Sequence, residues 1–233
     1  MIRLDFIPGT MCDERMWSGL TPLLGNDADC RFIPLHQARD RAAMQQLIAA
    51  RSAPSANLVA FSMGAYLALE HALAYPERVN SLVLIAASAK GLEADEIARR
   101  QRTMKVLASH AYSGMSAAQL RDFVHPSNMG KQAVVGVIRQ MALDLGKDVL
   151  LAQFAAAMER TDLLDRLAEL RCPVLLVGAT EDRKVAPADL RQMHVRCPGS
   201  RLIMLPDTGH MIPLEAPHAV AAAIQDFHVL GPA

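Results

Sequence analysis

Short apolar runs alternate with stretches that carry apolar side chains at helical spacing. The runs have the length of strands, and the stretches between them have the length of helices. Strands that alternate with helices predict a mostly parallel sheet with right-handed crossovers, flanked by helices, which is an α/β fold. The predicted strands are residues 2–7, 32–33, 58–61, 81–87, 173–178 and 201–205. The predicted helices around them are residues 16–24, 41–51, 63–75 and 219–227.

The predicted strand at residues 81–87 is apolar almost throughout, as in a strand that is covered by helices on both faces. The predicted strand at residues 2–7 departs from this pattern, because Asp5 lies in its middle. With the runs taken together, we expect a sheet of about six strands.

Between residues 91 and 160 the strand pattern disappears. We expect an all-helical insert here, a cap over the carboxyl ends of the strands, where open α/β sheets bind ligands. Residues 1–90 and 161–233 would then form the core. We expect this cap to choose the substrate and to contribute nothing to the machinery of the reaction. Its predicted helices are residues 93–109, 117–124, 131–145 and 148–158.

Two groups of side chains in this insert have alternative interpretations. Its methionines could line an adaptable apolar pocket, or they could fill the core, which is the commoner role. Arg99, Arg100 and Arg102 could bind an anionic substrate, although a solvated helix face is the commoner reading of such a cluster. The methionines are Met104, Met115, Met129, Met141 and Met158.

The composition of the chain excludes several classes of function. The chain has 233 residues, 52% of them hydrophobic, so it can bury a sizeable core. Its 24 basic and 24 acidic residues cancel, so we expect no nucleic-acid partner. No apolar run is long enough to span a bilayer, and the four cysteines lie far apart without a C-x-x-C pair. We therefore expect a soluble, cytoplasmic protein with structural cysteines and no membrane partner.

Ser62 lies where the strand at residues 58–61 meets a helical stretch with no loop between them. Such a tight turn leaves room only for small residues two positions before and after the serine, and Ala60 and Gly64 satisfy this requirement. The turn would expose the hydroxyl and direct the Met63 amide at a developing oxyanion, so Ser62 is a candidate nucleophile. The alternative is an N-cap serine that only begins the helix.

This turn resembles the nucleophile elbow of α/β-hydrolases, whose pattern is G-x-S-x-G, with Ala60 at the place of the first glycine. The loop after the first strand resembles the His-Gly-x turn of that family, with Pro8 at the place of the histidine and Trp17 at the expected spacing. On this resemblance, the backbone N–H groups of Thr10 and Met63 form the oxyanion hole.

An acid and a histidine each follow a later predicted strand, at the sheet edge where Ser62 emerges. The chain order Ser62, Asp182, His210 is the order that α/β-hydrolases use. Glu181 and Asp207 are alternative acids. Asp182, however, fills the family's G-x-x-x-D turn, and His210 lies in a G-H turn followed by an E-x-P motif. The other seven histidines match no motif.

This resemblance covers nearly the whole chain and implies an α/β-hydrolase fold with a catalytic triad. It implies a serine hydrolase that cleaves a carboxylic ester, thioester or lactone of a small molecule and needs neither cofactor nor metal. Two alternatives remain. The same triad can serve a lyase or a C–C bond hydrolase, and the fold can also serve as a ligand-binding protein without catalysis.

Overall fold

The computed structural model describes residues 1–229 and contains a six-stranded sheet in the order β2-β1-β3-β4-β5-β6. Every neighbouring pair of strands is parallel. The α/β prediction with about six strands is therefore confirmed. The strands are β1 (Ile2–Ile7), β2 (Ala28–Phe32), β3 (Ala56–Phe61), β4 (Val79–Ile85), β5 (Val174–Ala179) and β6 (Arg201–Leu205).

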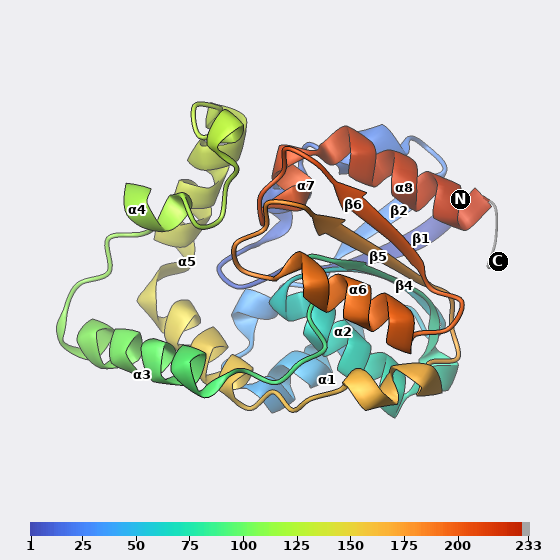
Figure 1. The fold of residues 1–233 in the computed structure, drawn as a ribbon, viewed down its shortest axis with the longest axis horizontal. Helices are drawn as coiled ribbons and strands as arrows, with labels where there is room; N and C mark the ends of the chain where they lie inside the picture. Colours follow the sequence, from blue (N-terminus) through green and yellow to red (C-terminus); the bar gives the residue numbers. More distant parts are fainter. Residues whose placement is uncertain (230–233) are drawn as a thin grey trace.

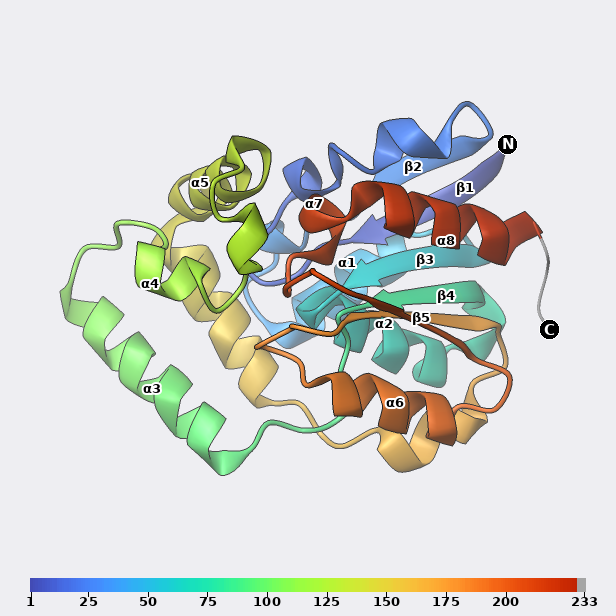
Figure 2. The ribbon, with the colours of Figure 1, turned by 45° about the horizontal axis from the view of Figure 1, so that its top comes forward.

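Helices cover both faces of the sheet, as Figures 1 and 2 show. On one face α1, α2 and α6 pack against the strands, and on the other lie α7, α8 and the short 3-10 helices η1 and η2. The α-helices are α1 (Arg41–Arg51), α2 (Met63–Ala74), α3 (Ala94–Ser109), α4 (Ala117–Leu120), α5 (Gln132–Met158), α6 (Pro187–Arg196), α7 (Ile212–Glu215) and α8 (Pro217–Val229). The 3-10 helices are η1 (Glu14–Trp17), η2 (Thr21–Leu24), η3 (Leu35–Gln37), η4 (Pro76–Arg78), η5 (Pro126–Asn128) and η6 (Leu164–Glu169).

Two large apolar clusters form the core, one on each face of the sheet, and a third, small cluster joins Met11 to Val149 and Leu150 of α5. Tyr66 and Met44 belong to the cluster under α1 and α2, whereas Trp17 and Phe227 belong to the cluster under α8. Because β3 and β4 contribute side chains to both clusters, their sequences are apolar without alternation.

Asp5 is fully buried in β1, and the structure explains why it is tolerated there. Its carboxylate accepts hydrogen bonds from Arg3 Nε at 2.9 Å and from the backbone N–H of Ala53 at 2.8 Å. Both oxygens therefore have partners, which removes most of the cost of burying a charge.

Several predicted boundaries are wrong. The helix expected at residues 16–24 is replaced by η1 and η2, because Pro22 has no N–H to donate within a continuous α-helix. The second strand begins at Ala28 and not at Phe32, and the helix expected at residues 117–124 ends at Leu120. Helix α6 was not predicted, and it buries only Leu190 and Met193, so it leaves a short apolar pattern in the sequence.

Between β4 and β5 the chain forms helices only, and α3, α4 and α5 lie at one end of the sheet (Figure 1). We call residues 91–160 the insert. Helix α5 is interrupted at Gly146, whose φ of 75° and ψ of −176° are not helical, so the two helices predicted at residues 131–145 and 148–158 meet there. Within residues 1–229 no helix, α5 included, has both the length and the apolar character needed to cross a membrane.

Candidate active site

Ser62 lies at the sharp turn between β3 and α2. Its φ of 52° and ψ of −114° are unfavourable for a residue with a side chain and cost about 1–3 kcal/mol. The turn brings α2 so close to the end of β1 that a Cβ on Gly64 would lie 2.3 Å from the carbonyl oxygen of Pro8. Only glycine fits there, which explains why a small residue is needed two positions after the serine.

His210 lies in the loop that follows β6, and its ring reaches Ser62. Nε2 of the imidazole is 3.0 Å from Ser62 Oγ, and the ring is almost completely buried. Phe61 packs against this ring with the two centroids 5.1 Å apart. The sequence pattern placed these two residues on the same sheet edge, and the structure brings them into hydrogen-bonding contact.

Asp182 follows β5 and contacts the other side of the same ring, with Oδ2 2.8 Å from His210 Nδ1. Its second oxygen, Oδ1, accepts the backbone N–H groups of Lys184 at 2.7 Å and Val185 at 2.9 Å. The carboxylate is therefore held in one orientation, in which it can accept a hydrogen bond from a protonated Nδ1 of His210. Such a contact would leave Nε2 free to accept the hydroxyl proton of Ser62.

Neither alternative acid takes this position in the described chain. Glu181 accepts a hydrogen bond from the hydroxyl of Thr180 at 2.6 Å and turns toward the Thr208 amide. Asp207 occupies a tight turn with a φ of 51°. Of the three candidates, Asp182 is the residue that contacts His210 within residues 1–229.

Thr10 and Met63 lie side by side next to Ser62. The Thr10 hydroxyl is 3.5 Å from Met63 Sδ, although the two residues are 53 positions apart in the chain. Neither backbone N–H finds an acceptor within residues 1–229. Two unpaired amides next to a serine hydroxyl are what an oxyanion hole requires, but the role of this pair stays a prediction.

The insert holds the loop that carries His210, which the sequence did not suggest. The carbonyl oxygen of Phe123 accepts the backbone N–H groups of His210 at 2.8 Å and Met211 at 3.1 Å. The Phe123 ring packs against the His210 ring with the centroids 5.7 Å apart. These contacts do not agree with the expectation that the insert contributes nothing to the reaction machinery, because the insert holds the loop of His210, a candidate residue of that machinery.

Glu215 joins the same loop to the insert. Its Oε2 accepts hydrogen bonds from His125 N, Asn128 Nδ2 and Gly209 N, and its Oε1 accepts one from Met211 N. Glu215 belongs to the E-x-P motif of the sequence, but the motif alone did not reveal what the carboxylate binds.

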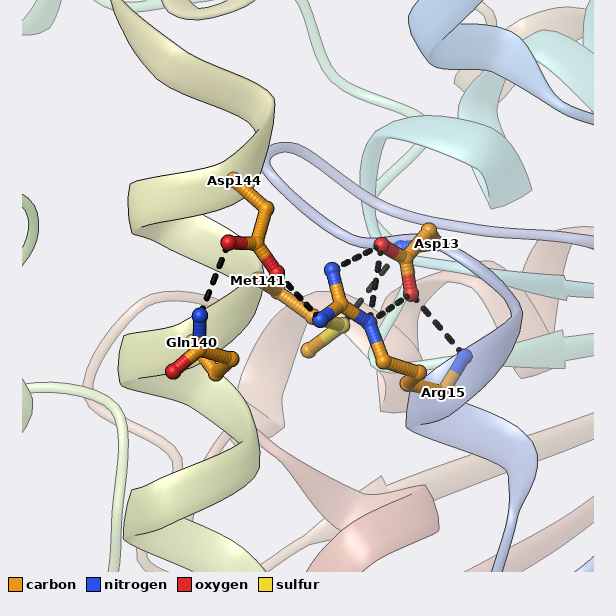
Figure 3. Close-up of polar contacts among 5 residues, drawn as sticks. All are labelled: Asp13, Arg15, Gln140, Met141 and Asp144. Carbon is orange, nitrogen blue, oxygen red and sulfur yellow. Dashed lines mark hydrogen bonds and ion pairs between the residues drawn. The ribbon is translucent and has the colours of Figure 1, made fainter.

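The loop that carries Thr10 is also bound to the insert, as Figure 3 shows. Arg15 binds Asp13 of its own loop at 2.6 Å and Asp144 of α5 at 2.5 Å. Met141 Sδ lies 3.5 Å from the backbone N–H of Asp13. Burial pushes the pKa of Asp13 upward, but the hydrogen bonds and charge of Arg15 outweigh burial, so that pKa lies below its usual value.

All four cysteines are free thiols. Cys12, next to the loop of Thr10, is buried, and burial together with the charge of Asp13 raises the pKa of its thiol to about 12. At neutral pH this thiol stays protonated and is a poor nucleophile. The structural role that we expected for this cysteine suits such a site, and the cytoplasmic location stays a prediction.

The arginines of α3 take different positions. Arg100 binds Glu96 on the same helix at 2.6 Å and lies over the Phe154 ring of α5 at 5.1 Å. Arg99 and Arg102 are exposed, and Arg99 lies 3.9 Å from Glu96. Arg100 is thus occupied within the insert, so these three side chains do not form one anion site.

A six-stranded parallel sheet with a serine, a histidine and an acid after three of its strands defines an α/β-hydrolase architecture. The model of the alpha/beta hydrolase family matches residues 6–223. The chain belongs to the alpha/beta hydrolase family.

Individual proteins agree with this assignment. A pimeloyl-[acyl-carrier protein] methyl ester esterase from Neisseria meningitidis serogroup B is 30% identical over 199 residues, which cover 83% of this chain and 77% of the esterase. A putative carbamate hydrolase from Shigella flexneri is 25% identical over 207 residues, covering 86% and 76% of the two chains. The structure of a thermophilic esterase from Thermogutta terrifontis superposes with a TM-score of 0.84 at 22% identity, covering 99% of this chain and 90% of that one.

Proposed function

We propose that the protein is a serine hydrolase that cleaves a carboxylic ester, thioester or lactone of a small molecule through an acyl-enzyme on Ser62. One observation carries this proposal. Ser62, His210 and Asp182 form a continuous series of contacts of 3.0 Å and 2.8 Å, beside two backbone amides that have no other acceptor within residues 1–229. The matched relatives are named as hydrolases of an ester and of a carbamate, which supports hydrolysis.

In the proposed mechanism, His210 Nε2 accepts the proton of Ser62 as Oγ attacks the carbonyl carbon of the substrate. Asp182 holds the imidazole in the required orientation and stabilises its positive charge. The N–H groups of Thr10 and Met63 donate to the oxyanion, and one such donor typically contributes about 10²–10³ in rate. The imidazolium then protonates the leaving group, and water cleaves the acyl-enzyme by the same steps.

The insert would form the roof of the substrate site. Its helices lie at the end of the sheet where Ser62 and His210 emerge, and it contacts the loops of both Thr10 and His210. Residues 1–90 and 161–233 would then act as the hydrolase core, and residues 91–160 as a cap. Such a roof would select substrates by shape and apolar contact.

The test combines active-site labelling with turnover. A fluorophosphonate should attach to Ser62 in the wild-type protein, and Ser62→Ala should abolish the label. Ser62→Ala should also lower kcat for p-nitrophenyl esters roughly 10³–10⁶-fold, and the Asp182→Asn and His210→Ala variants should combine with it non-additively. Ser55→Ala is a matched control, because Ser55 is exposed and lies just before β3.

Other results of the labelling and turnover assays would indicate a different function. Labelling at Ser62 without turnover of any ester, thioester or lactone would favour a lyase or a C–C bond hydrolase. Absence of both labelling and turnover would indicate a ligand-binding protein. Wild-type turnover in a folded Ser62→Ala variant would show that Ser62 is not the nucleophile.

A further inference from the structure

The peptide bond that follows Thr10 is held at both ends. Its N–H, which belongs to Met11, donates to Oε1 of Gln153 in α5 at 2.7 Å, and the two partners are 142 positions apart in the chain. Its carbonyl oxygen, which belongs to Thr10, accepts the thiol of Cys12 at 3.4 Å. The orientation of this peptide plane fixes the position of the adjoining backbone, including the Thr10 N–H.

Met11 adopts a conformation that needs such support. Its φ is 54°, a region that residues with side chains rarely occupy, and its side chain is buried. A strained backbone of this kind persists only where surrounding contacts hold it, and it is common at functional sites. The hydrogen bond from Met11 to Gln153 is one such contact, and it comes from the insert.

Helix α5 holds the same loop at a second place. Met141 lies against the Asp13 amide, and Asp144 binds Arg15, so these contacts come from the part of α5 before Gly146 (Figure 3). Gln153 lies in the part after Gly146. The two halves of the helix therefore hold the loop on either side of the Gly146 bend.

The other end of the Gln153 amide indicates why a glutamine is present. The side chain is completely buried, and its Nε2 has no partner within residues 1–229. The oxygen must face Met11, because the Met11 N–H needs an acceptor, so Nε2 points elsewhere. A buried donor without a partner lowers stability. An apolar side chain of similar length would avoid that cost, so the bond to Met11 is what glutamine adds at this position.

We infer that Gln153 is a positioning residue of the oxyanion hole: it fixes the peptide between Thr10 and Met11, so that the Thr10 N–H points at the oxyanion. This inference rests on the proposed function. Through Gln153 the insert acts on the step that stabilises negative charge.

The test compares Gln153→Met with Gln153→Glu. The methionine has a similar length but no acceptor for the Met11 N–H, whereas the glutamate retains one. We expect Gln153→Met to lower kcat about tenfold to a hundredfold, less than the loss of a whole oxyanion donor, with KM within about threefold. Its melting temperature should stay within a few degrees of the wild type, because the variant removes one unpaired buried donor, Gln153 Nε2, but leaves the Met11 N–H without its acceptor. Gln153→Glu retains an acceptor for the Met11 N–H, and burial favours its neutral, protonated carboxyl, so its kcat should lie well above that of Gln153→Met.

A trifluoromethyl ketone, which forms a tetrahedral adduct with the serine, should lose affinity for Gln153→Met in parallel with kcat. Gln101→Met is the control, because Gln101 is an exposed glutamine on α3 of the same insert. A Gln153→Met variant that retains wild-type kcat would overturn the inference. So would a variant that unfolds or melts far below the wild type, because the side chain would then be structural. If wild-type turnover did not depend on Ser62, the proposed function itself would fail, and the Ser62→Ala assay shows this separately.

Discussion

Helices α3 and α5 belong to the same insert but are packed in different ways. No residue of α3 is buried, whereas α5 buries Met141 and Gln153 completely. The hydrogen bonds from the insert to the loops of Thr10 and His210 come from α5 and from the segment around Phe123, whereas α3 adds the half-buried Leu107, which packs against the cluster of Met11, Val149 and Leu150. The insert therefore has an inner part that supports the loops of Thr10 and His210 and an outer helix, α3, that buries none of its residues.

The largest difference between the two parts should appear in stability. Met141→Ala removes a fully buried side chain. This side chain belongs to the apolar cluster under α8 and contacts the Asp13 amide. We expect the free energy of unfolding to fall by about 2–5 kcal/mol. Met104→Ala on α3 should change it by less than about 1 kcal/mol, because that side chain is only half-buried. Chemical denaturation measures both, and equal losses would contradict the division of the insert.

A smaller loss of stability should follow when the contacts between the insert and the loop of His210 are weakened. In Glu215→Gln an NH₂ group replaces one of the two oxygens that accept four donors, so at least one donor is left without a partner. We expect a loss of roughly 1–3 kcal/mol in stability and a lower kcat with little change in KM. Denaturation and steady-state kinetics give the two values. A variant with unchanged stability and kcat would show that Glu215 does not hold the loop.

The outer helix should affect selectivity more than stability. We expect Met104→Ala to change the ratio of kcat/KM between a long and a short acyl ester, since one methylene in an apolar site is worth ~1–3 kcal/mol. The short ester should be affected least. The assay compares p-nitrophenyl esters of different chain length. If both esters changed by the same factor, α3 would not be the selective part of the insert.

The features that could be predicted from sequence are those with local steric causes. The turn at Ser62 requires glycine at position 64, and the buried strands require continuous apolar runs, so both leave a pattern in the chain. Gly146 likewise separated two predicted helices, because a φ of 75° is accessible to glycine and α5 bends there. The sheet is confirmed, and the contacts of Ser62, Asp182 and His210 agree with the order read from the sequence.

The features that could not be predicted depend on contacts between distant parts of the chain. Gln153 on a helix has the same sequence context whether it faces solvent or the Met11 amide 142 positions away. Phe123 acts through its backbone carbonyl, which no side-chain pattern can reveal. Asp5 was a misfit in the strand pattern until its partners Arg3 and Ala53 were known.

Residue-resolved hydrogen exchange of the native protein tests the division of the insert most directly. The amides of Met11, His210 and Met211 bond to Gln153 and Phe123, so they should open together with α5 and exchange as slowly as its amides. The amides of α3 should exchange at least about tenfold faster, through local opening. If α3 were as protected as α5, or if the Met11 and His210 amides exchanged as fast as α3, the inner part of the insert would not support the loops of Thr10 and His210.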